Sequence, residues 1–143
     1  MTRYNRINLD GKSCTQTVLT TAATKPGSLC KIDLTTGKSV AVSGDVTGIA
    51  LYAANVDTLS GKAAADNIEA SVSAVLDYVE QGREMAILVD KTSVLKFDTP
   101  LAVSSTAGQL KVGTPGTDLI VAYSKEQYTV ASANAELVHV RSA

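Results

Sequence analysis

The chain has 143 residues, of which 45% are hydrophobic and 19% charged, and its formal net charge at pH 7 is -1. A net charge this close to zero argues against a protein that binds nucleic acid or anionic lipid by bulk attraction. The apolar share is too high, and the charge too low, for a disordered chain, and the length suits one domain with a core of its own. Val, Thr, Ala and Ser dominate while Phe occurs once and Trp is absent, a composition that predicts a β-rich protein with a thin core.

Export and membrane insertion are not expected from this sequence. No stretch approaches the ~20 consecutive apolar residues that span a bilayer, and the basic start of the chain has no apolar run of a signal peptide behind it. We therefore expect synthesis in the cytosol, where thiols stay reduced. Cys14 and Cys30 are interpreted as small hydrophobic residues. A bridge between them after release from a cell is the alternative.

The first stretch, residues 1–24, differs in composition from the rest of the chain. It is basic and polar, with only a few apolar residues between the polar ones. We interpret it as an extended N-terminal arm, which is either a frayed terminus or a segment that becomes ordered against a partner. The candidate contact residues of this arm are Arg3, Tyr4, Asn5, Arg6, Ile7 and Leu9.

A regular alternation of strands and turns begins at Lys25. Residues 29–34 alternate between apolar and polar and predict a strand with Cys30, Ile32 and Leu34 facing inward. A turn over 35–38 contains Gly37 and leads into a return strand, which predicts a hairpin. Residues 47–54 form a continuous apolar run, which is typical of a fully buried strand.

The middle of the chain contains the only credible helical segment. Ser60 could cap a short helix that runs through three alanines to Asn67. Residues 72–79 fit either a strand or a continuation of this helix, and we favour the strand. The turn over 80–83 then predicts a hairpin between residues 74–79 and 84–89.

Further short strands with intervening turns are predicted along the remainder of the chain. Turn signals recur every eight to twelve residues or so, a spacing that is typical of a β-sandwich or β-barrel. The sequence thus predicts a mainly β protein, a small β-barrel or β-sandwich with at most one short helix and an extended N-terminal arm. The later strands are expected at residues 94–97, 101–103, 109–112, 119–124 and 135–140.

An internal echo suggests that the domain predicted for residues 25–143 has two similar halves. The interval from Gly37 to Tyr52 equals the interval from Gly108 to Tyr123, and each copy reads as strand, glycine turn, strand, loop and apolar strand. Chance similarity between short β segments is the alternative explanation. Two copies are too few for a solenoid, but they suit a barrel or sandwich built from similar halves.

No group of residues in the sequence predicts catalysis, a metal site or a cofactor. The single histidine, His139, lies on the last predicted strand, where a structural role is far more common than a chemical one. Zinc-ligand spacing, phosphate-binding glycine loops, the nucleophile elbow and the calcium-loop pattern do not occur. Asp90 and Asp98 sit near predicted turns, where aspartates usually bond local amides. We therefore expect a protein without enzymatic activity.

Several segments recur in a characteristic order along the chain: Lys25-Pro26-Gly27-Ser28-Leu29, 36–37, 48–54, 78–85, 100–103, 108–110, 121–124 and 138–140. Their motifs are generic β signals. This order, from about Lys25 to Arg141, resembles that of the capsid decoration (cement) proteins of tailed bacteriophages.

The resemblance implies a structural virion protein that binds the outer surface of the phage head and stabilises the lattice of the major capsid protein. It also implies dimers or trimers of the chain, no direct contact with nucleic acid or membrane, and a place on the virion after assembly in the host cytoplasm. The family's extended terminal segment would correspond to the N-terminal arm. Two alternatives remain open: a structural protein of the phage tail or baseplate, and a small β-barrel ligand-binding module or hydrolase with a pocket near His139, Asp90 or Asp98.

Overall fold

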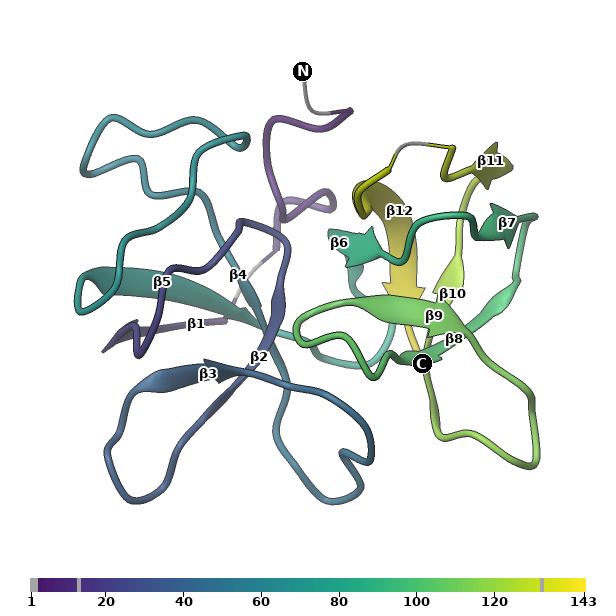
Figure 1. The fold of residues 1–143 in the computed structure, drawn as a ribbon, viewed down its shortest axis with the longest axis horizontal. Coiled ribbons are helices and arrows are strands. Elements are labelled where there is room, and N and C mark those ends of the chain that lie inside the picture. Colours follow the sequence, from purple (N-terminus) through teal and green to yellow (C-terminus); the bar gives the residue numbers. More distant parts are fainter. Residues whose placement is uncertain (1–2, 13, 132) are drawn as a thin grey trace.

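The computed structural model describes residues 3–12, 14–131 and 133–143, which form twelve β-strands and no helix (Figure 1). The mainly β fold with a small barrel is therefore confirmed. Within the described residues, no helix has the length and apolarity needed to cross a membrane. The strands are β1 (Thr15–Leu19), β2 (Leu29–Ile32), β3 (Ser39–Ala41), β4 (Tyr52–Ala54), β5 (Ser73–Tyr78), β6 (Glu84–Val89), β7 (Val94–Leu95), β8 (Pro100–Val103), β9 (Leu110–Val112), β10 (Ile120–Ser124), β11 (Tyr128–Thr129) and β12 (Glu136–Ser142).

The strands form two units that lie side by side in Figure 1. The first unit is a five-stranded sheet with the order β1-β5-β4-β2-β3, and the second is a closed barrel with the order β10-β12-β6-β9-β8. Read around the barrel from β6, the second order becomes β6-β12-β10-β8-β9. Each strand of the first unit therefore has a counterpart in the second, and the two short strands β7 and β11 form a separate pair added to the second unit.

The strand registers of the two units agree as well. Cys30 lies opposite Ala41 in the β2–β3 hairpin, and Leu101 lies opposite Val112 in the β8–β9 hairpin. The same number of residues separates the members of one pair from the members of the other. The sequence echo thus falls on strands that are equivalent in space.

The two units differ in how completely their own strands close a barrel. In the second unit a parallel pair between β6 and β9 closes the barrel, with Val89 opposite Leu110. In the first unit the corresponding closure is a single parallel bridge between Thr20 and Ser39. The first unit is thus a barrel that its own strands close at one point only.

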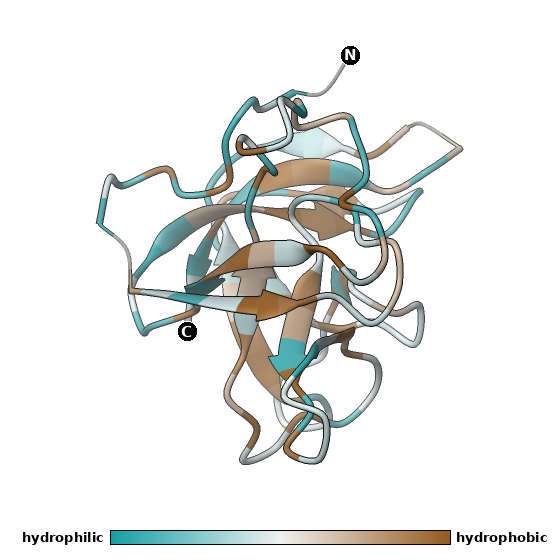
Figure 2. Ribbon diagram, turned by 90° about the vertical axis from the view of Figure 1, so that its left-hand side faces the viewer, coloured by the Kyte–Doolittle hydropathy of each residue, from teal (hydrophilic) through white to brown (hydrophobic). Residues whose placement is uncertain are grey.

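One hydrophobic core crosses the boundary between the units. Leu29, Val42, Val46 and Ala53 of the first unit pack in the same cluster as the inward residues of the second unit. A smaller cluster around Ile68 fills the interior of the first unit. In Figure 2 much of the hydrophobic colour lies on the strands at the centre of the molecule, while the loops mix hydrophilic, neutral and hydrophobic colours. The shared core makes the two units one packed body.

The boundary predicted after residue 24 is wrong. Residues 15–19, which we placed in the extended arm, form β1 and pair with β5 along its length, with Thr15 opposite Asp77 and Leu19 opposite Ser73. The polar run on β1 hid this strand, because an edge strand with one solvent face need not be apolar. The repeated body therefore begins about ten residues earlier than the turn at Lys25 suggested.

Three local predictions are also wrong. Residues 60–67 form turns and not a helix, because polar loop residues there find local bonds such as the one that Asp57 accepts from the Ser60 amide. The turn at 80–83 joins β5 to β6, but β6 pairs with β12 and β9. Tyr52–Ala54 alone is a strand within the apolar run 47–54.

Leu34 lies on the outside, contrary to the prediction from alternation. β2 ends at Ile32, and the chain turns at Asp33, whose carboxylate accepts a hydrogen bond from the Thr35 amide at 2.8 Å. The Leu34 side chain is 98% exposed as a result. Alternation fixes the direction of a side chain only while the strand continues.

Candidate functional site

Two surfaces of the molecule are candidates for binding. One is the N-terminal segment, which we define as residues 3–9 and which the sequence singled out. The other is an apolar groove in the first unit, which the sequence did not indicate. Figure 1 places the N-terminal segment toward the upper edge and the β2–β3 and β3–β4 loops toward the lower edge.

The N-terminal segment begins with a clamp formed by Arg3 on the second unit. Its guanidinium donates to both carboxylate oxygens of Glu126, at 2.7 and 2.8 Å. The same guanidinium lies 3.5 Å from the ring centroid of Tyr128. A bidentate ion pair combined with cation–π stacking holds Arg3 in one orientation.

Glu126 is the shared hydrogen-bond acceptor that holds the start of the segment. Besides Arg3 it accepts hydrogen bonds from the Tyr4 hydroxyl at 3.2 Å and from the His139 amide at 3.0 Å. Burial by itself would raise the pKa of the Glu126 carboxyl, but the hydrogen bonds and charge that surround it outweigh burial and hold this pKa below its usual value. Glu126 is therefore a carboxylate at neutral pH and anchors the start of the segment.

The next residues of the segment pair antiparallel with β6 through an isolated bridge between Asn8 and Met85. The Ala86 amide donates to the Ile7 carbonyl at 2.8 Å, and the Leu9 amide donates to the Glu84 carbonyl at 3.1 Å. The Ile7 side chain is fully buried in the shared core. The segment thus occupies the edge of β6 that β9 leaves open.

The six predicted contact residues therefore fall into two groups, those engaged with the rest of the chain and those exposed. Ile7 is a core residue of this chain, and Arg3, Tyr4 and Leu9 are engaged with the second unit. Asn5 and Arg6 alone among them are exposed without such contacts in the described residues. Of the six residues, Asn5 and Arg6 are therefore the ones that remain accessible to a partner.

His139 has a structural environment. Its Nε2 lies 3.1 Å from Glu84 Oε1, and its ring meets that of Tyr4 edge-on at 6.5 Å between centroids. Asp90 accepts from the Ser104 hydroxyl, and Asp98 lies against Lys125. The three residues thus have separate partners and form no common pocket. Among the residues that the structure describes, no group of acidic, histidine or cysteine side chains could hold a metal ion.

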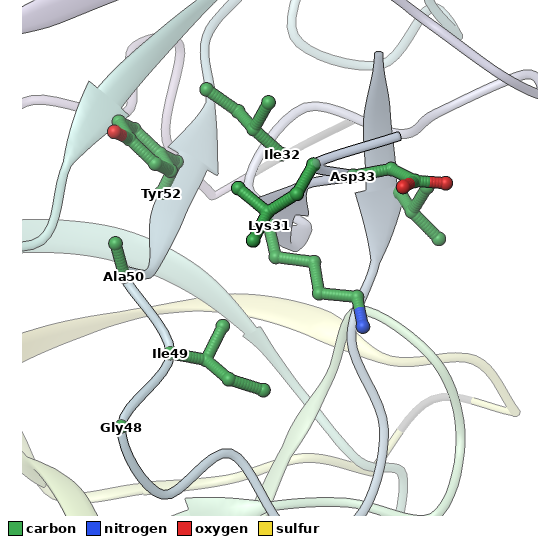
Figure 3. Close-up of a pocket in the computed structure, with 9 residues that line it drawn as sticks. Lys31, Ile32, Asp33, Gly48, Ile49, Ala50 and Tyr52 are labelled. Atoms are coloured by element: carbon green, nitrogen blue, oxygen red, sulfur yellow. The ribbon is translucent and has the colours of Figure 1, made fainter. Parts of the chain in front are cut away.

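The groove of the first unit lies between the β2–β3 hairpin and the end of the β3–β4 loop (Figure 3). In this view Tyr52, Ala50 and Ile49 follow one another along one side, while Lys31 and Asp33 lie across from them. Its lining is mostly apolar, with charge at one rim. The residues that line it, called the first-unit groove below, are Lys31, Ile32, Asp33, Leu34, Val40, Gly48, Ile49, Ala50 and Tyr52.

A smaller depression continues this groove toward β1. Ala50 and Tyr52 line both, and Thr15 and Gln16 of β1 line only the smaller one. The two together extend from the β2–β3 hairpin to the first residues of β1. Sequence reasoning missed this surface because it depends on Leu34 leaving the sheet and on β1 joining it.

Comparisons with known proteins found neither a family model that matches this chain nor a curated protein that matches it.

Proposed function

We propose that this chain is a structural virion protein without enzymatic activity, which binds the outer surface of a phage head and stabilises the lattice of the major capsid protein. Two lines support the proposal. The first is the resemblance to phage decoration proteins in the order of segments from Lys25 to Arg141. The second is the kind of surface that the molecule presents.

The observation that carries the proposal is the apolar first-unit groove with Leu34 at its rim. Leu34 is 98% exposed, and the half-buried Ile49 and Tyr52 lie in the groove beside it. Large apolar side chains that gather around an open groove are typical of a surface that binds another protein. A groove of this kind binds by area and shape and needs no reacting group.

Many copies of such a chain can reinforce a shell. Each copy adds one modest interface, and the repeated lattice multiplies the number of interfaces that must fail together. The near-zero net charge favours this use, since densely packed copies repel one another little. The exposed Asn5 and Arg6 are candidates for a second contact with the shell.

The test is reconstitution on heads prepared without this chain. Purified protein is added to the heads, bound protein is collected by sedimentation, and release of DNA on heating is measured. We expect saturable binding and release at a higher temperature. Absence of binding to heads contradicts the proposal, and binding to isolated tails but not to heads favours the tail or baseplate alternative.

Two variants locate the contact. Leu34→Glu places a charge in the groove and should weaken binding to heads at least tenfold, because the charge must be desolvated at the interface. Leu59→Glu is the matched control, since Leu59 is also a highly exposed leucine but lies in the β4–β5 loop at the opposite edge of Figure 1. Equal binding to heads by the two variants would show that the groove is not the contact surface.

A further inference from the structure

Two equivalent strand edges, that of β6 in the second unit and that of β1 in the first, differ in whether they are paired. In the second unit, the edge of β6 that faces away from β12 is paired along its length. Glu84 and Ala86 bond to the N-terminal segment, Leu88 donates to the Gly27 carbonyl at 3.0 Å, and β9 pairs with the end of the strand. An extended piece of chain thus covers the part of this edge that β9 does not reach.

The corresponding edge of β1 in the first unit is open. The Tyr78 amide donates to the Cys14 carbonyl, and the Thr20 amide donates to the Val72 carbonyl, so the even-numbered residues of β1 bond to β5. Backbone groups alternate in direction along an antiparallel strand. Those of Thr15, Thr17 and Leu19 therefore face away from β5.

Among the described residues, no strand pairs with this side of β1 before the bridge from Thr20 to Ser39. Most of β1 is exposed. Its five residues, TQTVL, also include no charge and no proline, which are two of the devices that usually protect an edge. The edge is an available template for another strand.

The open edge and the apolar groove belong to one site. The depression that Thr15 and Gln16 line continues into the first-unit groove through Ala50 and Tyr52. The bridge from Thr20 to Ser39 brings β3 to the free side of β1, and Val40 of β3 lines the groove. A strand added in the gap between β1 and β3 would therefore lie beside the groove and point alternate side chains to one face. In the second unit Ile7 does the same: it lies on the added segment and is buried in the core.

We infer that β1 accepts an extended segment of the major capsid protein, which pairs antiparallel with Thr15–Leu19 and places an aliphatic side chain in the first-unit groove. This inference rests on the proposed function. It adds the mode of recognition, in which backbone hydrogen bonds supply affinity and a side-chain pocket supplies specificity.

Two observations favour a segment of a different protein over a second copy of this chain. The N-terminal segment of each copy is already engaged, since Ile7 is buried and Arg3 is paired with Glu126. The β1 strand of a second copy is paired with its own β5, so two strands would have to approach together. The gap beside β1 is closed at one end by the bridge between Thr20 and Ser39. One extended strand fits this opening best.

Backbone hydrogen exchange on the wild-type chain is the direct test. We expect the Thr17 and Leu19 amides to exchange at least tenfold more slowly on heads than in the free protein. The Gln16 amide, which faces β5, is the internal reference and should change little. Failure of the wild type to bind heads would refute the proposed function. Binding with unchanged Thr17 and Leu19 amides would refute this inference alone.

Variants at Thr17 supply a second readout. Thr17→Pro removes an outward amide that makes no bond to β5, so the fold should persist, as prolines are tolerated on sheet edges. We expect binding to heads to fall at least tenfold. Thr17→Val keeps the amide and should bind like the wild type. Wild-type binding by a folded Thr17→Pro chain overturns the inference.

Filling the groove gives an independent check. Ala50 is exposed where the groove and the depression meet, so Ala50→Phe should block the inserted side chain without disturbing the core. We expect a loss of binding to heads for Ala50→Phe and none for Ala50→Ser. Self-association of the wild-type chain that Thr17→Pro abolishes would show β1 pairing between copies and would overturn the inference as stated.

Discussion

Gly37 and Gly108 occupy the same position in two equivalent hairpins, yet only Gly108 is part of a contact between the units. Both have positive φ, 69° and 81°. The Gly108 amide donates to the Val42 carbonyl at 2.8 Å, and its carbonyl accepts from the Leu29 amide at 2.9 Å. A Cβ at Gly37 would meet nothing within 4 Å. The tip of the β8–β9 hairpin therefore contacts the first unit, whereas the tip of the β2–β3 hairpin makes no equivalent contact with the second unit.

This difference predicts unequal effects of the same substitution. Gly37→Ala should lower the free energy of unfolding by about 1 kcal/mol, the cost of placing alanine in the left-handed region. Gly108→Ala carries that cost and also brings a Cβ to 3.1 Å from the Ser28 Cβ, so its loss should be clearly larger. Denaturant unfolding of the two variants measures both values. Equal losses would mean that the Gly108 turn does not hold the units together.

The N-terminal segment should contribute to stability through Ile7. Ile7→Ala removes a fully buried side chain from the shared core, and the expected loss is about 2–5 kcal/mol. Arg6→Ala is the neighbouring control, and because Arg6 is exposed the change should stay within about 0.5 kcal/mol. Thermal unfolding of both variants checks this. A neutral Ile7→Ala variant would mean that the Ile7 side chain does not stabilise the shared core.

The fold was predictable from the sequence where local signals agreed with the tertiary structure. The β2–β3 hairpin and strands β8 to β10 follow from glycine turns between short apolar runs, and the equal interval from Gly37 to Tyr52 and Gly108 to Tyr123 falls on equivalent strands. These features depend on residues close together in the chain.

Features that depend on distant contacts were not predictable. β1 is polar and becomes a strand only because β5 is beside it. The strands that flank the 80–83 turn looked like a hairpin, but long-range pairing places β5 in the five-stranded sheet and β6 in the closed barrel. The smaller depression beside the first-unit groove combines Tyr52 with the distant Gln16 and exists only because β1 joins the sheet. No spacing in the sequence reports such a surface.

The clamp on Glu126 predicts a pH-dependent N-terminal segment. The pKa of this carboxyl is lower in the folded state than its usual value near 4.5, so its stabilising effect is present above that pH. The effect is lost as the pH falls through the lower, folded-state pKa. We expect protease cleavage within residues 3–9 to become faster as the pH falls below about 4.5. Cleavage is compared at each pH with an unstructured peptide of the same sequence.

Glu126→Gln is the matched variant for this effect. It cannot form the ion pair with Arg3, so cleavage of the segment should already be faster at neutral pH and should vary less between neutral and acidic conditions. A wild-type chain whose segment stays equally protected throughout acidification would show that Arg3 and Glu126 are not what holds it.

Asp77 is expected to lower the stability of the first unit. Its side chain is buried, Oδ2 accepts from Asn55 at 2.8 Å, and Oδ1 has no hydrogen-bond partner among the described residues. Burial raises the pKa of Asp77, against the opposing effect of the Asn55 hydrogen bond. Ionisation therefore costs stability as the pH rises from the unfolded value through the raised folded value.

Asp77→Asn removes that ionisation and should raise the free energy of unfolding at neutral pH, with no gain in acid, where the wild-type carboxyl is already protonated. Asp66→Asn, at an exposed position, should change little at either pH. Denaturant unfolding at the two pH values separates the cases. An Asp77→Asn chain less stable than the wild type at neutral pH would refute this reading of the buried carboxylate.

Binding to the phage head is the claim on which the functional account depends, and electron microscopy of particles assembled with and without this chain tests it most directly. The account predicts two-lobed density on the outer surface of the head, with the first unit toward the shell, in particles that contain the chain, and loss of that density without it. Heads that look identical with and without the chain, or density confined to the tail, would contradict the account.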